Sequence, residues 1–168
     1  MKIKYSYHGG MSGTRWLDAD EQRAWRRLAA VVQLLPAAMD AQLQRDTGLT
    51  HFGYWVLAML SEAPERSLRM SELAARSNAS ASRLSHVVTR LECRGWVRRE
   101  RATEDGRGNV AVLTDAGWEA VVAAAPGHVE NVRQLVFDGL DHEQVAELFE
   151  VCDRLLASLD PEGHARLC

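Results

Sequence analysis

The stretch MSELAARSNASASRLSHVVTRLECRGWVRRERATEDGRGNVAVLT, residues 70–114, decides the fold of this chain. Its first half predicts two short helices, at residues 72–77 and 80–94, joined by a tight turn. Ser71 and Ser80 stand where capping residues are expected, because a serine hydroxyl can accept a hydrogen bond from the first turn of a helix. The expected order is therefore helix, turn, helix.

The second half of the stretch predicts two strands, at residues 96–102 and 109–113. Between them, residues 104–108 have the sequence EDGRG, which is typical of a hairpin turn. A short extended piece is expected at residues 68–70. The pair of helices is thus followed directly by a charged hairpin.

Charge is segregated along the chain. Residues 66–107 contain ten arginines against five acidic residues, a net charge of +5, whereas the whole chain carries −3 and the remainder therefore −8. A positive region on an otherwise acidic protein indicates a confined surface that binds a polyanion.

The helix expected at residues 80–94 has two distinct faces. Leu84, Val87, Val88 and Leu91 recur at the spacing of a buried stripe. The opposite face consists of residues that can donate hydrogen bonds, none of them acidic, namely Ser82, Arg83, Ser85, His86, Thr89 and Arg90. The major groove of B-DNA, about 12 Å wide, accepts one helix, so this face is expected to contact base edges and phosphates.

The hairpin offers a second contact with DNA. Arg107 lies between two glycines at its tip, where it could enter a narrow, strongly negative minor groove. Asp105 could orient that guanidinium. Arg98, Arg99 and Arg101 would follow the strand and neutralise phosphates.

Four further helices are expected, beginning at Asp18, Thr50, Thr114 and Asp141. Glu21, three residues after Asp18, completes a capping box, and Pro36 is expected to bend or divide the first helix. The outer helices carry apolar stripes that need a surface to cover them. Two-fold association of identical chains is the commonest way to provide one.

The motifs MSELAAR at 70–76, SASRLSHVVTRLECRGWV at 80–97 and DGRGNVAVLT at 105–114, followed by Gly117, resemble the MarR family of bacterial regulators. The resemblance extends over residues 18–159. It implies homodimers whose first and last helices interlock and whose winged lobes contact successive major grooves of a near-palindromic operator. It also implies repression, relieved in many members by a small aromatic or phenolic ligand.

The expected fold class is mainly α with a small β wing, a winged helix-turn-helix lobe plus helical dimerisation arms from both termini. The expected segments are a disordered tail at 1–14, an N-terminal dimerisation helix at 15–49, the DNA-binding lobe at 50–115 and C-terminal dimerisation helices at 116–168.

Carried over by position, Ser82, Ser85 and His86 match the base-facing part of the recognition helix, and Arg90 matches a phosphate contact. Many relatives have arginine where this chain has His86, and a histidine, which can be neutral at pH 7, is expected to read a base less stiffly. The full set of DNA-binding candidates is Ser80, Ser82, Arg83, Ser85, His86, Thr89, Arg90, Arg99, Arg101, Asp105 and Arg107. Two nearby arginines, Arg76 and Arg94, could instead pair with Glu72 and Glu92 on the surface.

The sequence defines a binding cleft for an effector less clearly than it defines the DNA-binding surface. Its candidate residues are aromatic or imidazole side chains on either side of the lobe, namely Trp25, His51, Tyr54, Trp55 and Trp96. Each could equally be ordinary core packing.

Several function classes are not supported by the residues. Cys93, Cys152 and Cys168 have neither disulfide-framework nor zinc-site spacing, so a reducing cytoplasm is expected, with thiol sensing left open. No metal, cofactor or membrane span is expected. The chain lacks a nucleophile–base pair and a phosphate-binding glycine loop, so an enzyme is not expected. The alternative function is a winged-helix module that binds protein or RNA.

Overall fold

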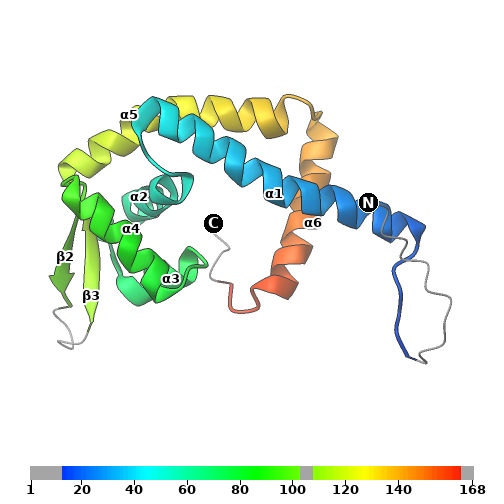
Figure 1. Ribbon diagram of the computed structural model, residues 1–168, viewed down its shortest axis with the longest axis horizontal. Helices are drawn as coiled ribbons and strands as arrows, with labels where there is room; N and C mark the ends of the chain where they lie inside the picture. Colours follow the sequence, from blue (N-terminus) through cyan, green and yellow to red (C-terminus); the bar gives the residue numbers. More distant parts are fainter. Residues whose placement is uncertain (1–12, 103–107, 164–168) are drawn as a thin grey trace. The chain divides into compact units, whose positions relative to one another are not determined.

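The computed structural model describes residues 13–102 and 108–163, so the expected tail lies almost entirely outside the described residues. The chain divides into two compact units, residues 1–34 and 35–168. The fold is mainly helical with one small sheet (Figure 1). In chain order the elements are α1 (Ala19–Thr47), α2 (His51–Glu62), η1 (Pro64–Arg66), β1 (Ser67–Arg69), α3 (Met70–Arg76), α4 (Ala81–Cys93), β2 (Val97–Arg101), β3 (Asn109–Leu113), α5 (Asp115–Val132), η2 (Arg133–Phe137) and α6 (His142–Leu159).

Side-chain caps start most of these helices where the sequence predicts them. The side-chain oxygens of Thr50, Ser80, Thr114 and Asp141 each accept a hydrogen bond from the backbone N–H three residues later. Asp18 does the same at α1, and the Glu21 carboxylate accepts a 2.8 Å hydrogen bond from the Asp18 N–H, which confirms the capping box. These bonds satisfy amide groups that have no partner inside the helix.

Two expectations about helix boundaries differ from the structure. Of the two effects expected of Pro36, division of the helix does not occur, because α1 is helical from Ala19 to Thr47 and one missing N–H is outweighed by the regular bonds on either side. Ser71 does not cap α3. The helix begins at Met70 after Arg69, which makes no side-chain cap, because β1 pairs up to Arg69 and fixes the backbone there.

The sheet has three strands in the order β1-β3-β2, all antiparallel. Val97 pairs with Leu113 and Arg101 with Asn109, as a hairpin requires. The extended piece before α3 thus becomes a third strand, with Ser67 opposite Val112. Gly117 allows α5 to start close to the sheet, since a Cβ there would lie 2.1 Å from the Trp96 carbonyl oxygen.

The core of residues 35–168 lies where α2, α3, α4 and the sheet meet. The largest fully buried side chains there include Leu57, Leu60, Leu73, Leu84 and Val88. The stripe predicted on α4 is confirmed, because Leu84, Val87, Val88 and Leu91 are all buried. Burial of that stripe fixes which face of α4 points to solvent. In the described part of the chain, no helix is long and apolar enough to cross a membrane.

Candidate nucleic-acid interface

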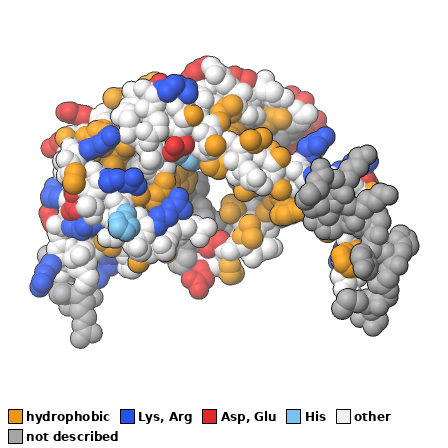
Figure 2. All heavy atoms as spheres, viewed as in Figure 1, with side chains coloured by type: hydrophobic (Ala, Val, Ile, Leu, Met, Phe, Trp, Pro, Cys, Tyr) orange, Lys and Arg blue, Asp and Glu red, His pale blue; other side chains and the backbone are white. Residues whose placement is uncertain are grey.

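The exposed face of α4 carries all six side chains that the sequence places there. Ser82, Arg83, Ser85, His86, Thr89 and Arg90 are exposed, while the stripe behind them is buried. Figure 2 shows arginine side chains and a histidine gathered over α4. A rigid helix with one core-facing side and one donor-bearing side has the geometry needed to enter a groove of DNA.

The N-terminus of α4 is itself suited to an anion. Ser80 Oγ accepts a 3.2 Å hydrogen bond from the Arg83 N–H, and the first turn contains no acidic residue. The other free N–H groups of that turn and the positive end of the helix dipole favour a phosphate. Arg83 is held beside this end by a cation–π contact, with its guanidinium carbon 4.3 Å from the centre of the Phe52 ring.

The arginines of β2 differ in what they contact. Arg98 forms an ion pair with Glu100 on the same strand, and Arg101 is exposed at the end of the strand. Arg99 turns back towards α4 and pairs with Glu92 at 3.0 Å. The wing-tip candidates Asp105 and Arg107 lie within residues 103–107, outside the described residues.

A cluster of aromatic and imidazole side chains joins α2 and α5. The Tyr54 and His128 rings lie 4.5 Å apart between centroids, and those of His51 and His128 lie 6.0 Å apart. Burial lowers the pKa of His51, although Asp40 opposes the shift, and burial together with His51 lowers the pKa of His128. Burial raises the pKa of Tyr54. Nδ1 of His128 is buried and, among the described residues, has no hydrogen-bond partner.

The structure therefore does not bring the five effector-pocket candidates together in one site. His51 and Tyr54 share the cluster with His128, whereas Trp96 stacks against Arg94, 4.7 Å from its guanidinium carbon. Trp55 is partly exposed on α2. Sequence analysis missed His128, because a single histidine after a proline and a glycine in a helix gives no distinctive pattern.

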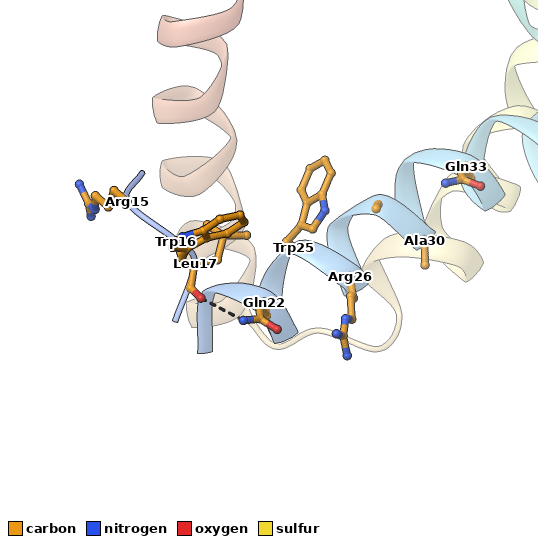
Figure 3. Close-up of a pocket in the computed structure, with 9 residues that line it drawn as sticks. Arg15, Trp16, Leu17, Gln22, Trp25, Arg26, Ala30 and Gln33 are labelled. Carbon is orange, nitrogen blue, oxygen red and sulfur yellow. Dashed lines mark hydrogen bonds between the residues drawn. The ribbon is translucent and has the colours of Figure 1, made fainter. Parts of the chain in front are cut away.

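Trp25 belongs to the N-terminal unit, where it lines a pocket of about 570 Å³ with Trp16 and Leu17. Figure 3 shows the two indole rings on one side of this segment and Arg26 on the other. Gln22 Nε2 donates a 2.9 Å hydrogen bond to the Leu17 carbonyl and holds the preceding chain against the start of α1. The pocket wall is mainly apolar and stands open to solvent.

Comparison with known proteins matches this geometry to one family. Residues 49–108 match the sequence profile of the MarR family. Sco3205, a MarR family transcriptional regulator from Streptomyces coelicolor solved in complex with DNA, is 48% identical over 90% of this chain and 94% of its own, with a TM-score of 0.85. The chain belongs to the MarR family.

Two further relatives agree. AbsC, a MarR family transcriptional regulator from Streptomyces coelicolor, is 42% identical over 87% of this chain and 98% of its own, with a TM-score of 0.81. The transcriptional repressor YetL of Bacillus subtilis is 28% identical over 109 residues, which cover 61% of this chain and 65% of the repressor. The match thus spans slightly less than two thirds of that repressor's length.

Membership of the MarR family gives names to the elements described above. The chain is a DNA-binding transcriptional regulator whose helix-turn-helix is α3 and α4 and whose wing is the β2–β3 hairpin. Cys93 and Cys152 are exposed free thiols, and Cys168 lies outside the described residues. Within the described part of the chain, no three His, Cys, Asp or Glu side chains are grouped as metal ligands.

Proposed function

We propose that this MarR protein is a homodimeric repressor that binds a near-palindromic DNA operator and is released by a small aromatic ligand. The observation that carries the proposal is the two-sided α4, whose buried stripe is fixed to the core while the six exposed side chains opposite it carry hydroxyl, guanidinium or imidazole groups. The relative solved with DNA and the relative named a repressor support it.

The proposal gives each part of the interface a role. Ser82, Ser85 and His86 would face base edges, because they occupy the first turns of the exposed face of α4. Arg90 and Arg101 would bind phosphates, as would the N–H groups that follow Ser80. Arg107 would enter the neighbouring minor groove, with Asp105 orienting its guanidinium.

A second copy of this chain would cover the apolar outer helix. In the described chain α6 has no buried residue, even though one of its faces is apolar. On that face Phe149 is 68% exposed and Leu159 is 79% exposed. Patches of this kind on a monomer are typical of interaction sites. We assign residues 15–49 and 116–168 to dimerisation and residues 50–115 to the DNA-binding lobe.

DNA binding is tested by selecting duplexes from a random library and titrating the selected duplex against a shuffled one. A regulator is expected to prefer the selected duplex by about a thousandfold or more at physiological salt. Affinity should also fall steeply as salt rises, because each neutralised phosphate releases counterions. Equal binding to both duplexes would remove the operator claim, and binding only to RNA or protein would favour the alternative module.

Dimerisation is tested by light scattering on Phe149→Glu. A carboxylate at this exposed apolar position should produce monomers, because burying an unpaired charge is costly. Ser158→Glu is the matched control, since it adds the same group nine residues along α6, about 180° around the helix from Phe149, at an exposed position and should leave dimers intact. A dimeric Phe149→Glu protein would exclude this surface.

The effector site is assigned to the cluster of His51, Tyr54 and His128. The buried, unpaired Nδ1 of His128 could bond to a phenolic or carboxylate group. A phenolic carboxylate that binds should raise the melting temperature by mass action and lower affinity for the selected duplex. His128→Phe should abolish both effects, and retention of both would place the ligand elsewhere.

A further inference from the structure

Arg99 differs from the other arginines of the wing in its burial and in its partners. Its side chain is 25% exposed and that of Glu92 is 28% exposed. The two side chains pair at 3.0 Å between Nη1 and Oε2, and the Arg99 N–H donates a 3.0 Å hydrogen bond to the other carboxylate oxygen. Both oxygens of Glu92, near the end of α4, are therefore engaged by one residue of β2.

The other end of the Arg99 guanidinium reaches the middle of α4. Nη2 lies 2.8 Å from the Ser85 carbonyl oxygen, 3.1 Å from Thr89 Oγ1 and 3.4 Å from Ser85 Oγ. Thr89 Oγ1 in turn donates a 2.9 Å hydrogen bond to the same carbonyl. One planar guanidinium thus spans two turns of the recognition helix, which the single ammonium of a lysine could not do.

These contacts leave Arg99 poorly placed to bind a phosphate. Glu92 already neutralises its charge, and both protons of Nη2 are directed at α4. Turning the guanidinium towards DNA would leave the Glu92 carboxylate without its cation. This movement would cost more free energy than turning an exposed arginine that has no carboxylate partner. Arg101, exposed at the end of the same strand, has no such contacts among the described residues.

The same contacts orient the Ser85 hydroxyl. A guanidinium beside Ser85 Oγ takes one of its lone pairs and repels its proton, so the O–H points away from Arg99. Ser85 is exposed on the donor-bearing face, so that proton is directed to solvent or DNA. In the major groove its partner would be an acceptor, namely purine N7, guanine O6 or thymine O4.

We propose that Arg99 is a positioning residue for DNA recognition, which locks the wing to α4 through Glu92 and holds Ser85 as a hydrogen-bond donor to a base. Arg99 acts through Ser85 and contacts no phosphate. The inference rests on the proposed operator binding, which supplies the bases that Ser85 contacts.

The salt dependence of DNA binding separates positioning from phosphate contact. Losing one phosphate contact in each protomer of a dimer should reduce the slope of log affinity against log salt by about 1.8. Arg99→Gln is expected to keep the wild-type slope but to lose about tenfold in preference for the selected duplex over the shuffled one. A reduced slope with unchanged preference would overturn the proposal.

Two further variants keep the test decisive if Arg99→Gln folds poorly. Glu92→Gln keeps every cation but removes the partner that holds Arg99, so preference should again fall. Arg99→Lys keeps the charge but loses the planar fork, so it should not restore preference. If Arg99→Lys has the full wild-type preference, a point charge is sufficient and the proposal fails. If Glu92→Gln keeps the wild-type preference, the pairing with Glu92 is not needed to position Arg99, and the proposal fails as well.

The wild-type protein separates failure of operator binding from failure of the role of Arg99. If the wild type shows no preference between the duplexes, the operator claim fails and the role of Arg99 fails with it. If the wild type prefers the selected duplex and Arg99→Gln loses slope alone, only the role of Arg99 is wrong. Circular dichroism of each variant confirms that the fold is retained.

Discussion

Arg94 Nη2 donates a 2.8 Å hydrogen bond to the carbonyl oxygen of Gly48, which joins the end of α4 to the end of α1. The expected surface pairing of Arg94 with Glu92 is wrong, because Arg99 occupies both oxygens of Glu92. The parallel expectation for Arg76 is confirmed by its 2.6 Å contact with Glu72. One arginine therefore links the recognition helix to the helix that precedes the lobe.

Gly48→Ala is expected to destabilise the protein by about 1–2 kcal/mol, because the backbone at Gly48 has a φ of +67° and L residues avoid that region. A Cβ there would also lie 3.3 Å from Arg94 Nη2. Urea unfolding measures the change. Gly139→Ala is the control, since no atom lies within 4 Å of its added Cβ, and an equal loss in both variants would contradict the assignment.

Ser80 allows helix capping to be separated from DNA binding. Ser80→Ala removes the acceptor for the Arg83 N–H and should cost about 1 kcal/mol in thermal or urea unfolding. Ser80→Asp should keep that stability, because aspartate caps as well as serine, yet it should weaken DNA binding by repelling a phosphate. Ser80→Asn is the neutral control. If Asp and Asn variants bind DNA equally, no phosphate lies at this helix end.

The histidine cluster predicts a pH dependence with a definite sign. Burial lowers the pKa of His51 and His128 in the folded state from 6.5, so below that value the unfolded chain binds more protons. Their contribution to stability is complete above pH 6.5 and is lost as the pH falls through the lowered values. The melting temperature should drop as the pH falls below about 6.5. His128→Asn should show a smaller drop, and an unchanged drop would exclude the cluster as its cause.

Local chemistry made much of this fold predictable from sequence. A capping side chain and an apolar stripe act within one or two turns, so the starts of α2, α4, α5 and α6 and the buried side of α4 were predictable. The hairpin strands were also predictable, because turn residues and β-branched residues occur next to each other in the sequence.

The remaining features depend on contacts between distant residues. Nothing near Ser67 indicates that it pairs with Val112, so β1 appeared only as an extended piece. Arg98, Arg99 and Arg101 have similar sequence surroundings, yet only tertiary packing turns Arg99 towards Ser85. His128 joins His51 and Tyr54 across two helices, a proximity that periodicity within one helix cannot show.

The most direct test of the central claim is a crystal structure of the protein with its selected duplex. We predict α4 in the major groove with Ser82, Ser85 and His86 facing base edges, and a second copy placed one helical turn, about 34 Å, along the duplex. A complex in which the exposed face of α4 makes no contact with DNA would contradict the account.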